Sequence, residues 1–222
     1  MKGAHSGFDH LARGYRILEF LAFGSYLERA RFAFLDRIAD DSSEILLLGE
    51  GDGRCAERLA RLAPGARIHC VDSSRGMIER ASRRIAAAGA GDRVTFECTD
   101  ALSFSPGPAS FDAVATFFFL DCFDEAGVAS IVGRIDASLR PEARWLFADF
   151  VLPRRGLGRL RARAWVGILY AFFRVATSLR TSELPPSEEI LLRAGWGRTA
   201  CQDFQFGLLR SAVFERAPQD RR

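Results

Sequence analysis

Short apolar runs alternate along the chain with segments in which apolar residues recur every three or four positions. The first run, 44–48, reads Glu-Ile-Leu-Leu-Leu and meets a cluster of glycines, and a helical pattern over 55–62 follows it and stops before Pro64. This order predicts a strand, a turn and a helix. The unit recurs, with further strands predicted at 67–71, 93–98, 111–116 and 144–150 and helices at 76–88 and 125–139.

Strands that alternate with helices in this way form βαβ units, and these build a parallel sheet that is covered on both faces. The C-terminal part departs from the rhythm. After helical patterns at 158–179 and 187–194, two strand-like runs, 198–205 and 208–216, are separated by Phe206 and Gly207 alone. So short a link permits an antiparallel hairpin. The predicted fold is α/β: a Rossmann-like, doubly wound sheet of seven strands, mostly parallel, with this hairpin at one edge.

The N-terminal segment 8–39 has a helical pattern, with Phe8, Leu11, Tyr15 and Leu18 at helical spacing. We expect one domain over 1–222, comprising a helical lid at 1–40, a core at 41–216 and a tail at 217–222.

Composition limits the possible classes of protein. The chain has 222 residues, of which 48% are apolar, enough for one sizeable core. It has no apolar run of about 18 residues and no apolar signal core near Met1, so we expect a soluble, cytoplasmic protein. The five cysteines form no Cys-x-x-Cys pair, which argues against a metal site or a disulfide framework. Cys70 and Cys98 end predicted strands and are expected to be buried thiols.

The net charge is +3, yet the segment 151–180 carries seven arginines and no acid. The rest of the chain lacks the broad basic face that nucleic-acid binding requires, so no nucleic-acid partner is expected. The pattern over 159–179 predicts an amphipathic basic helix. This helix either caps the sheet or helps to form an apolar acceptor pocket with Trp165 and Tyr170, and the arginines of 154–180 could then contact an anionic substrate or membrane surface weakly.

A glycine-rich turn follows the first predicted strand. Gly49, Gly51 and Gly53 alternate there, and Asp72 closes the next strand. Such glycines let the backbone approach a ligand, the following helix presents free N–H groups, and an acid at this spacing can accept hydrogen bonds from ribose hydroxyls. The glycines also satisfy the dinucleotide pattern with Ala56 in its third place, so an NAD(P)-dependent oxidoreductase is an alternative. The extra Gly49 and the short chain favour a different adenosine cofactor.

The order of five motifs resembles that of class I S-adenosylmethionine (SAM)-dependent methyltransferases. The likeness covers roughly residues 8 to 216, and the opening Phe8-Asp-His-Leu-Ala-Arg-Gly-Tyr15 is similar to the start of the ubiquinone/menaquinone methyltransferase-like branch. The motifs that carry it are Glu44–Arg54, Val71-Asp72, Cys98-Thr-Asp-Ala101, Phe111–Thr116 and Leu139-Arg-Pro141.

The resemblance implies SAM as the cofactor and assigns roles to residues. The three glycines would line its methionine end, Asp72 and its neighbour Ser73 would lie at the ribose, and Asp100 with Ala101 would border the adenine. The other roles implied are that Met77 packs against the adenine and that Thr116 and Phe117 lie beside the sulfonium. Taken by themselves, Asp100 could equally be a solvated loop acid and Met77 a core residue.

One residue departs from the family pattern. Leu47 stands where relatives often have an acid, two residues before the first glycine. Glu50, between the glycines, could replace that acid and bind the cationic amine of SAM. The alternative is a solvated glutamate in a turn.

A sulfonium methyl group is already activated, so alignment with the acceptor supplies most of the rate acceleration and no catalytic residue is obligatory. If a base is needed, His10, Asp121 and Asp149 are candidates. Tyr15 belongs with the aromatic residues expected around the acceptor. The predicted function is in-line methyl transfer to a small, apolar or aromatic acceptor. The alternatives are a non-catalytic SAM-binding protein and the oxidoreductase named above.

Overall fold

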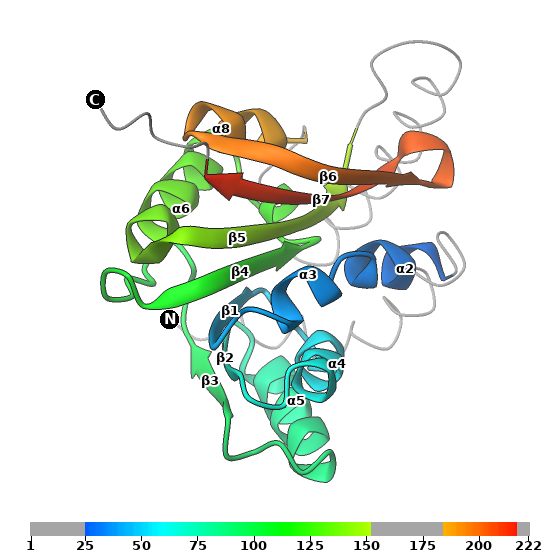
Figure 1. The fold of residues 1–222 in the computed structure, drawn as a ribbon, viewed down its shortest axis with the longest axis vertical. Coiled ribbons are helices and arrows are strands. Elements are labelled where there is room, and N and C mark those ends of the chain that lie inside the picture. Colours follow the sequence, from blue (N-terminus) through cyan, green and yellow to red (C-terminus); the bar gives the residue numbers. More distant parts are fainter. Residues whose placement is uncertain (1–24, 152–183, 217–222) are drawn as a thin grey trace, which may run out of the picture.

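The computed structural model describes residues 25–151 and 184–216 (Figure 1). Several residues predicted to act at the site lie outside these ranges, as do most of the predicted lid and the basic helix. The site residues concerned are His10, Tyr15, Trp165 and Tyr170.

A seven-stranded sheet forms the centre of the molecule, in the order β3-β2-β1-β4-β5-β7-β6. Its first five strands are parallel, whereas β7 runs antiparallel to both β5 and β6. The predicted Rossmann-like α/β class with a C-terminal hairpin is thereby confirmed. The strands are β1 (Glu44–Leu48), β2 (Arg67–Asp72), β3 (Val94–Cys98), β4 (Phe111–Phe117), β5 (Leu139–Phe150), β6 (Trp196–Phe204) and β7 (Leu209–Arg216).

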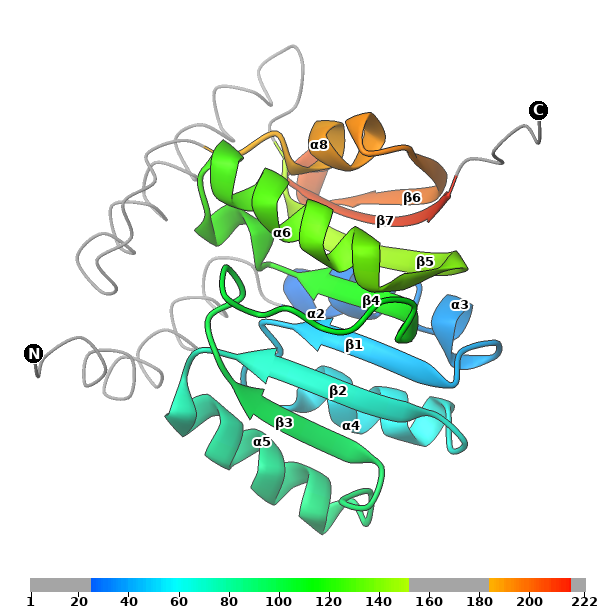
Figure 2. The ribbon, with the colours of Figure 1, turned by 90° about the vertical axis from the view of Figure 1, so that its left-hand side faces the viewer.

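Helices cover the sheet on both faces (Figures 1 and 2). Along β1 the side chains alternate between two cores: Ile45 and Leu47 pack on one face, and Leu46 and Leu48 on the other. The first core is completed by α3 (Asp36–Ala39), α4 (Arg54–Leu62) and α5 (Arg75–Ala87), and the second by α6 (Glu125–Ser138) and α8 (Ser187–Arg193). Burial on both faces explains why the central strands are apolar at nearly every position.

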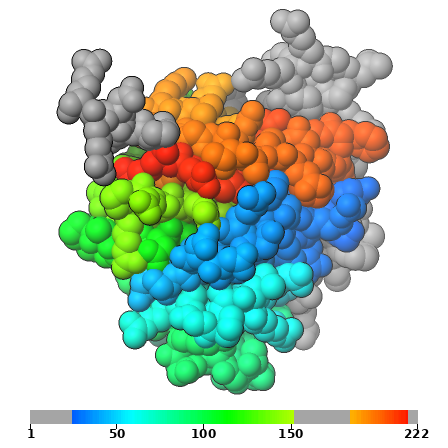
Figure 3. Space-filling view, in the orientation of Figure 1, coloured from blue at the N-terminus to red at the C-terminus, as the bar shows by residue number. Residues whose placement is uncertain are grey.

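Helix α2 (Tyr26–Phe32) lies across the end of the sheet, against the β6–β7 hairpin (Figure 3). Its buried Leu27 and Ala30 pack with Phe150, Phe204 and Leu209, which lie where β5 and β6 end and β7 begins. The helical pattern expected to continue to residue 39 is broken by a turn at 33–35, after which α3 begins. α2 is therefore held at the carboxyl edge of the parallel strands, where open α/β sheets bind ligands.

Two local details differ from the sequence-based expectations. The hairpin link covers 205–208, not two residues, and it places Gln205, Phe206 and Gly207 in succession in the left-handed region. Cys98 is exposed because β3 is the outermost strand, so the expectation of a buried thiol was wrong there, whereas Cys70 on β2 is buried. Within the described ranges, no helix combines the length and apolar character required to cross a membrane.

Candidate cofactor site

The glycine-rich turn joins β1 to α4, and its three glycines differ in what surrounds them. All three have left-handed backbones, with φ of +67° at Gly49, +69° at Gly51 and +84° at Gly53. A Cβ atom on Gly49 would overlap the Phe119 ring, and one on Gly53 would lie 2.7 Å from the Ala81 Cα of α5. A Cβ on Gly51 would meet nothing within 4 Å. Gly49 and Gly53 are thus fixed by packing, and Gly51 marks the open side on which a ligand could approach.

Asp72 links the end of β2 to this turn. One carboxylate oxygen accepts a hydrogen bond from the Gly51 N–H at 2.9 Å, and the other accepts from the Ser74 N–H at 2.8 Å. Burial raises the pKa of Asp72, while these two bonds oppose the shift. Each oxygen keeps a second lone pair that could accept from a ribose hydroxyl, so the acid can hold the turn and a nucleoside together. The turn and the acid therefore fit an adenosine cofactor with a slender tail.

The residues expected at the ribose and adenine lie at the same edge of the sheet. Ser73 is exposed beside Asp72, and Met77 is half-buried in the first turn of α5, where its N–H donates to the Ser74 hydroxyl at 3.3 Å. Asp100 is exposed beyond β3, and its carboxylate accepts from the Leu102 N–H at 2.9 Å. Ala101 is buried next to it. Their predicted roles toward the cofactor remain predictions, and their placement is compatible with them.

Thr116 and Phe117 end β4 next to the turn, because β4 pairs with β1 in a register that sets Thr116 beside Leu48. The Thr116 side chain is buried, and its hydroxyl accepts a hydrogen bond from the Trp145 indole N–H at 2.9 Å. Phe117 is likewise buried in the core. Any contact of these two residues with a sulfonium would therefore involve mainly their backbone. Phe118, which follows, has φ of +52°, a strained value for a bulky residue.

Glu50 has a structural partner that the sequence did not indicate. Its carboxylate accepts from the Ala56 N–H at 2.9 Å and so satisfies a free donor in the first turn of α4. Burial is the main reason that its pKa rises from 4.5 to about 7, although the Ala56 bond and the charge of Arg31 lower it. Glu50 is therefore not a solvated turn residue. Because Glu50 lies between two glycines of the turn, its predicted role toward the cofactor amine stays a prediction.

If Glu50 binds that amine, SAM affinity should depend on pH. The raised pKa means that the cofactor-free protein must release a proton from Glu50 to bind a cation, so affinity should rise with pH up to about 7 and then level. Titration calorimetry of Glu50→Gln should show affinity about 10-fold weaker than wild type near neutral pH and no dependence on pH below it. A wild-type affinity that stays constant over this range would contradict the role.

The raised pKa also predicts how stability depends on pH. The folded protein binds more protons at Glu50 than the unfolded chain between pH 4.5 and about 7, so this residue lowers the free energy of unfolding as the pH rises through that window. Glu50→Gln should remove that slope in urea titrations, which provides an independent check on its burial.

A pair of aspartates, Asp121 and Asp149, lies between the ends of β4 and β5. The Asp121 N–H, in the 3₁₀ turn Leu120–Cys122, donates to one carboxylate oxygen of Asp149 at 3.2 Å, and the Phe150 N–H donates to the other at 2.9 Å. The two carboxyl groups are also hydrogen-bonded to each other. Burial raises the pKa of Asp121 to about 6, and burial together with the charge of Asp121 raises that of Asp149 well above its usual range. Because two carboxylates this close do not both ionise readily, the arrangement favours a proton shared between them.

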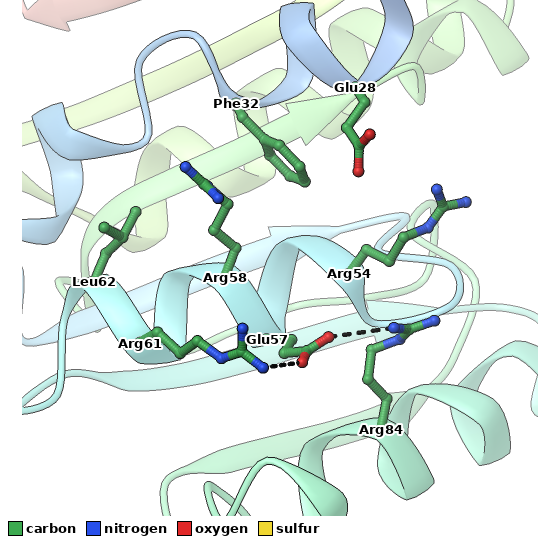
Figure 4. Close-up of a pocket in the computed structure, with 8 residues that line it drawn as sticks. All are labelled: Glu28, Phe32, Arg54, Glu57, Arg58, Arg61, Leu62 and Arg84. Carbon is green, nitrogen blue, oxygen red and sulfur yellow. Dashed lines mark hydrogen bonds and ion pairs between the residues drawn. The ribbon is translucent and has the colours of Figure 1, made fainter. Parts of the chain in front are cut away.

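A groove of about 350 Å³ separates α2 from α4 and α5 (Figure 4). It contains four arginines, but Glu57 pairs with Arg61 at 2.5 Å and with Arg84 at 3.2 Å, and Arg58 stacks on Phe32. None of the residues predicted to bind the cofactor lines it, so this groove is not the candidate site. It is lined by Glu28, Phe32, Arg54, Glu57, Arg58, Arg61, Leu62 and Arg84.

Comparison with known proteins agrees with this geometry. Residues 45–142 match the family described as a methyltransferase domain. A ubiquinone/menaquinone biosynthesis C-methyltransferase from Desulfotalea psychrophila is 25% identical over 156 residues, which cover 70% of this chain and 61% of that protein. A 6-hydroxytryprostatin B O-methyltransferase from Neosartorya fischeri is 32% identical over 126 residues, covering 55% and 28%.

Solved structures share the fold. The N-methyltransferase NodS from Bradyrhizobium japonicum, in complex with S-adenosyl-L-homocysteine, superposes with a TM-score of 0.62 at 19% identity, covering 87% of this chain and 88% of that one. The mitomycin 7-O-methyltransferase MmcR gives a TM-score of 0.66 at 19% identity, covering 96% and 61%. The chain spans about 60% of the length of the first curated relatives that it matches.

The fold, the glycine turn with its acid and these matches support one class of protein, the class I SAM-dependent methyltransferases, which the chain resembles most clearly over residues 45–142. SAM is the cofactor of that class. The relatives carry C-, O- and N-methyltransferase names, so the comparisons do not select a branch within it.

Proposed function

We propose that this protein transfers the methyl group of SAM to a small acceptor molecule. The observation that carries the proposal is the hydrogen bond between Asp72 and the Gly51 N–H, which joins the acid at the end of β2 to the open side of the glycine turn. That arrangement would hold a nucleoside and its tail at the carboxyl edge of the sheet. The match of residues 45–142 to a methyltransferase domain supports the same conclusion.

When bound, SAM supplies an activated methyl group on a sulfonium. The part of the protein is to hold the acceptor in line with that group and to exclude water. Asp72 and the glycine turn fix one reactant, and α2, packed across the carboxyl edge through Leu27 and Ala30, encloses the site from above.

The proposed acceptor is small and apolar or aromatic. Half-buried aromatic rings follow β4 at this edge: Phe118 lies 5.4 Å from Phe150 between ring centroids, and Phe119 lies 5.1 Å from Phe123. Such rings offer a flat, apolar surface against which a planar acceptor can pack. The curated relatives' names refer to ubiquinone/menaquinone biosynthesis and to 6-hydroxytryprostatin B, and the quinones named in the first support the same class of acceptor.

The acid pair provides a base for an acceptor that must lose a proton. Asp121 is half-buried and its pKa is raised to about 6, whereas Asp149 is buried and its pKa is raised well above the usual range. Asp121 would take the acceptor's proton as the new bond to the methyl group forms and the bond to sulfur breaks. Asp149 positions Asp121 and does not touch the acceptor.

Asp121→Asn should lower kcat at least about 100-fold, because general bases contribute two or more orders of magnitude when a proton must leave. SAM affinity should not change. The acidic limb of the kcat profile, set by the raised pKa of Asp121, should disappear in the variant. Steady-state kinetics against pH gives both results, with the exposed Glu125→Gln as a control. Unchanged kcat would remove Asp121 from the mechanism.

Turnover is the experiment that tests the proposed function. Purified protein is incubated with methyl-labelled SAM and a panel of phenols, hydroquinones and aromatic amines, and label transfer is counted. We expect transfer to at least one acceptor class, and we expect Asp72→Asn to abolish it at low SAM concentration. Tight SAM binding with no transfer to any acceptor would favour a non-catalytic SAM-binding protein.

A further inference from the structure

Arg31, on α2, is a half-buried cation that faces the glycine turn. Its guanidinium lies 5.7 Å from the centroid of the Phe118 ring. Among the residues that the structure describes, no carboxylate lies within ion-pair distance of it, in contrast to Arg84 of the nearby groove, which bonds to both Asp52 and Glu57. Holding a cation partly out of water without a carboxylate partner is costly unless a ligand supplies the missing charge.

The packing of α2 fixes where this guanidinium can lie. Ala30, the preceding residue, is fully buried against the ends of β5 and β7, so the helix cannot turn freely about its axis. Phe118 follows β4, whose pairing with β1 sets Thr116 beside Leu48, the residue that precedes Gly49. The Phe118 ring thus holds Arg31 near the start of the glycine turn, close enough for its charge to act on Glu50.

Glu50 and Arg31 are close enough to interact through their charges, yet they form no ion pair. Glu50 is held back by its bond to the Ala56 N–H at the start of α4, and Arg31 by the Phe118 ring. Two opposite charges fixed apart on either side of an open turn are complementary to a zwitterion, which presents an ammonium group to one and a carboxylate to the other.

We propose that Arg31 binds the α-carboxylate of the cofactor's methionine tail, opposite Glu50. This inference rests on the proposed function and extends it. A guanidinium matches a carboxylate in shape and charge and can donate two parallel hydrogen bonds to it. Arg31 would then make α2 part of the cofactor site.

The test compares two ligands, S-adenosylhomocysteine and its analogue that lacks the carboxylate, by titration calorimetry. Wild type should bind the decarboxylated analogue at least about 10-fold more weakly. Arg31→Gln should lose about the same factor for S-adenosylhomocysteine and should bind the analogue as wild type does. Arg31→Lys should recover part of the loss. The matched control is Arg29→Gln on the same helix, whose guanidinium stacks on Tyr26 and Phe204, and its affinities should equal those of wild type.

The outcomes are separable. If wild type binds both ligands with affinities within about 2-fold, Arg31 does not read the carboxylate, whether or not the variants fold. If Arg31→Gln weakens both ligands equally, the residue acts through packing of α2 and the inference fails, although the proposed function stands. If wild type binds neither ligand, the proposed function itself fails, and the inference fails with it.

Discussion

Replacing Asp72 with asparagine is expected to weaken SAM binding about 10- to 100-fold, which is the value of losing a hydrogen bond to a charged acceptor. The change keeps the shape of the side chain but removes the charge, and one of its two acceptor oxygens becomes an amide donor. Either Gly51 or Ser74 then loses the partner of its N–H, so the variant disturbs the open side of the turn as well as the proposed ribose contact. Titration calorimetry with SAM measures the effect.

Asp52→Asn is the matched control for this prediction. Asp52 lies in the same turn, but its carboxylate bonds to Arg54 and Arg84 on the outer side. Its replacement should leave SAM affinity within about 2-fold of wild type, because its partners belong to α4 and α5 and it bonds to neither Gly51 nor Asp72. Thermal melting of both variants separates binding from stability. Equal losses in the two variants would mean that the turn responds to any change of charge and that Asp72 has no special contact.

Gly53→Ala is expected to cause a larger loss of stability than Gly51→Ala in the same turn. The residue has φ of +84°, and its new Cβ would lie 2.7 Å from the Cα and 2.9 Å from the Cβ of Ala81 on α5. A left-handed alanine costs about 1–2 kcal/mol, and overpacking adds about 1–3 kcal/mol, because the contact is with backbone that cannot turn aside. Urea titrations should therefore show a loss of about 2–5 kcal/mol.

Gly51→Ala measures the cost of a left-handed alanine without the overpacking expected at Gly53. Its φ of +69° imposes a similar backbone cost, but its Cβ meets no atom within 4 Å, so we expect a loss of only about 1–2 kcal/mol. Gly51→Ala should weaken SAM binding more than Gly53→Ala does, since its added methyl lies on the open side of the turn. A larger stability loss at Gly51 than at Gly53 would contradict the packing described for the turn.

The sheet could be predicted from the sequence because strands that are buried on both faces are apolar at nearly every position. β1 and β4 are apolar almost throughout, and the alternation with helices has few topological solutions. The hairpin could be predicted because its link is too short for a crossover. The glycine turn and Asp72 could be predicted from their spacing alone, because that spacing places both at one edge of a parallel sheet.

Side-chain partners could not be predicted in the same way. Thr116 follows the strand pattern, but whether its hydroxyl faces a ligand or the Trp145 indole depends on a neighbour 29 residues away. Glu50 caps α4 because the turn folds its side chain back toward Ala56, a bend that no local pattern specifies. The pairing of Asp121 with Asp149 likewise arises from the parallel pairing of β4 with β5.

The contribution of Arg31 was missed for a related reason. The helical pattern over 8–39 identified a covering element but not the turn at 33–35 that ends α2, nor the face that α2 presents to the site. That face is set by Leu27 and Ala30, which pack against the C-terminal hairpin, so its position depends on residues almost 180 positions further along the chain. The hairpin and α2 thus complete the edge at which the cofactor site lies.

Titration of the purified protein with SAM, S-adenosylhomocysteine and NADPH tests the central claim most directly, because the same glycine turn and acid could in principle serve either kind of adenosine cofactor. The account predicts that SAM and S-adenosylhomocysteine bind with dissociation constants of about micromolar order, each corresponding to about 8 kcal/mol, and that NADPH gives no saturable heat. Tight binding of NADPH, with no response to SAM or S-adenosylhomocysteine, would contradict it.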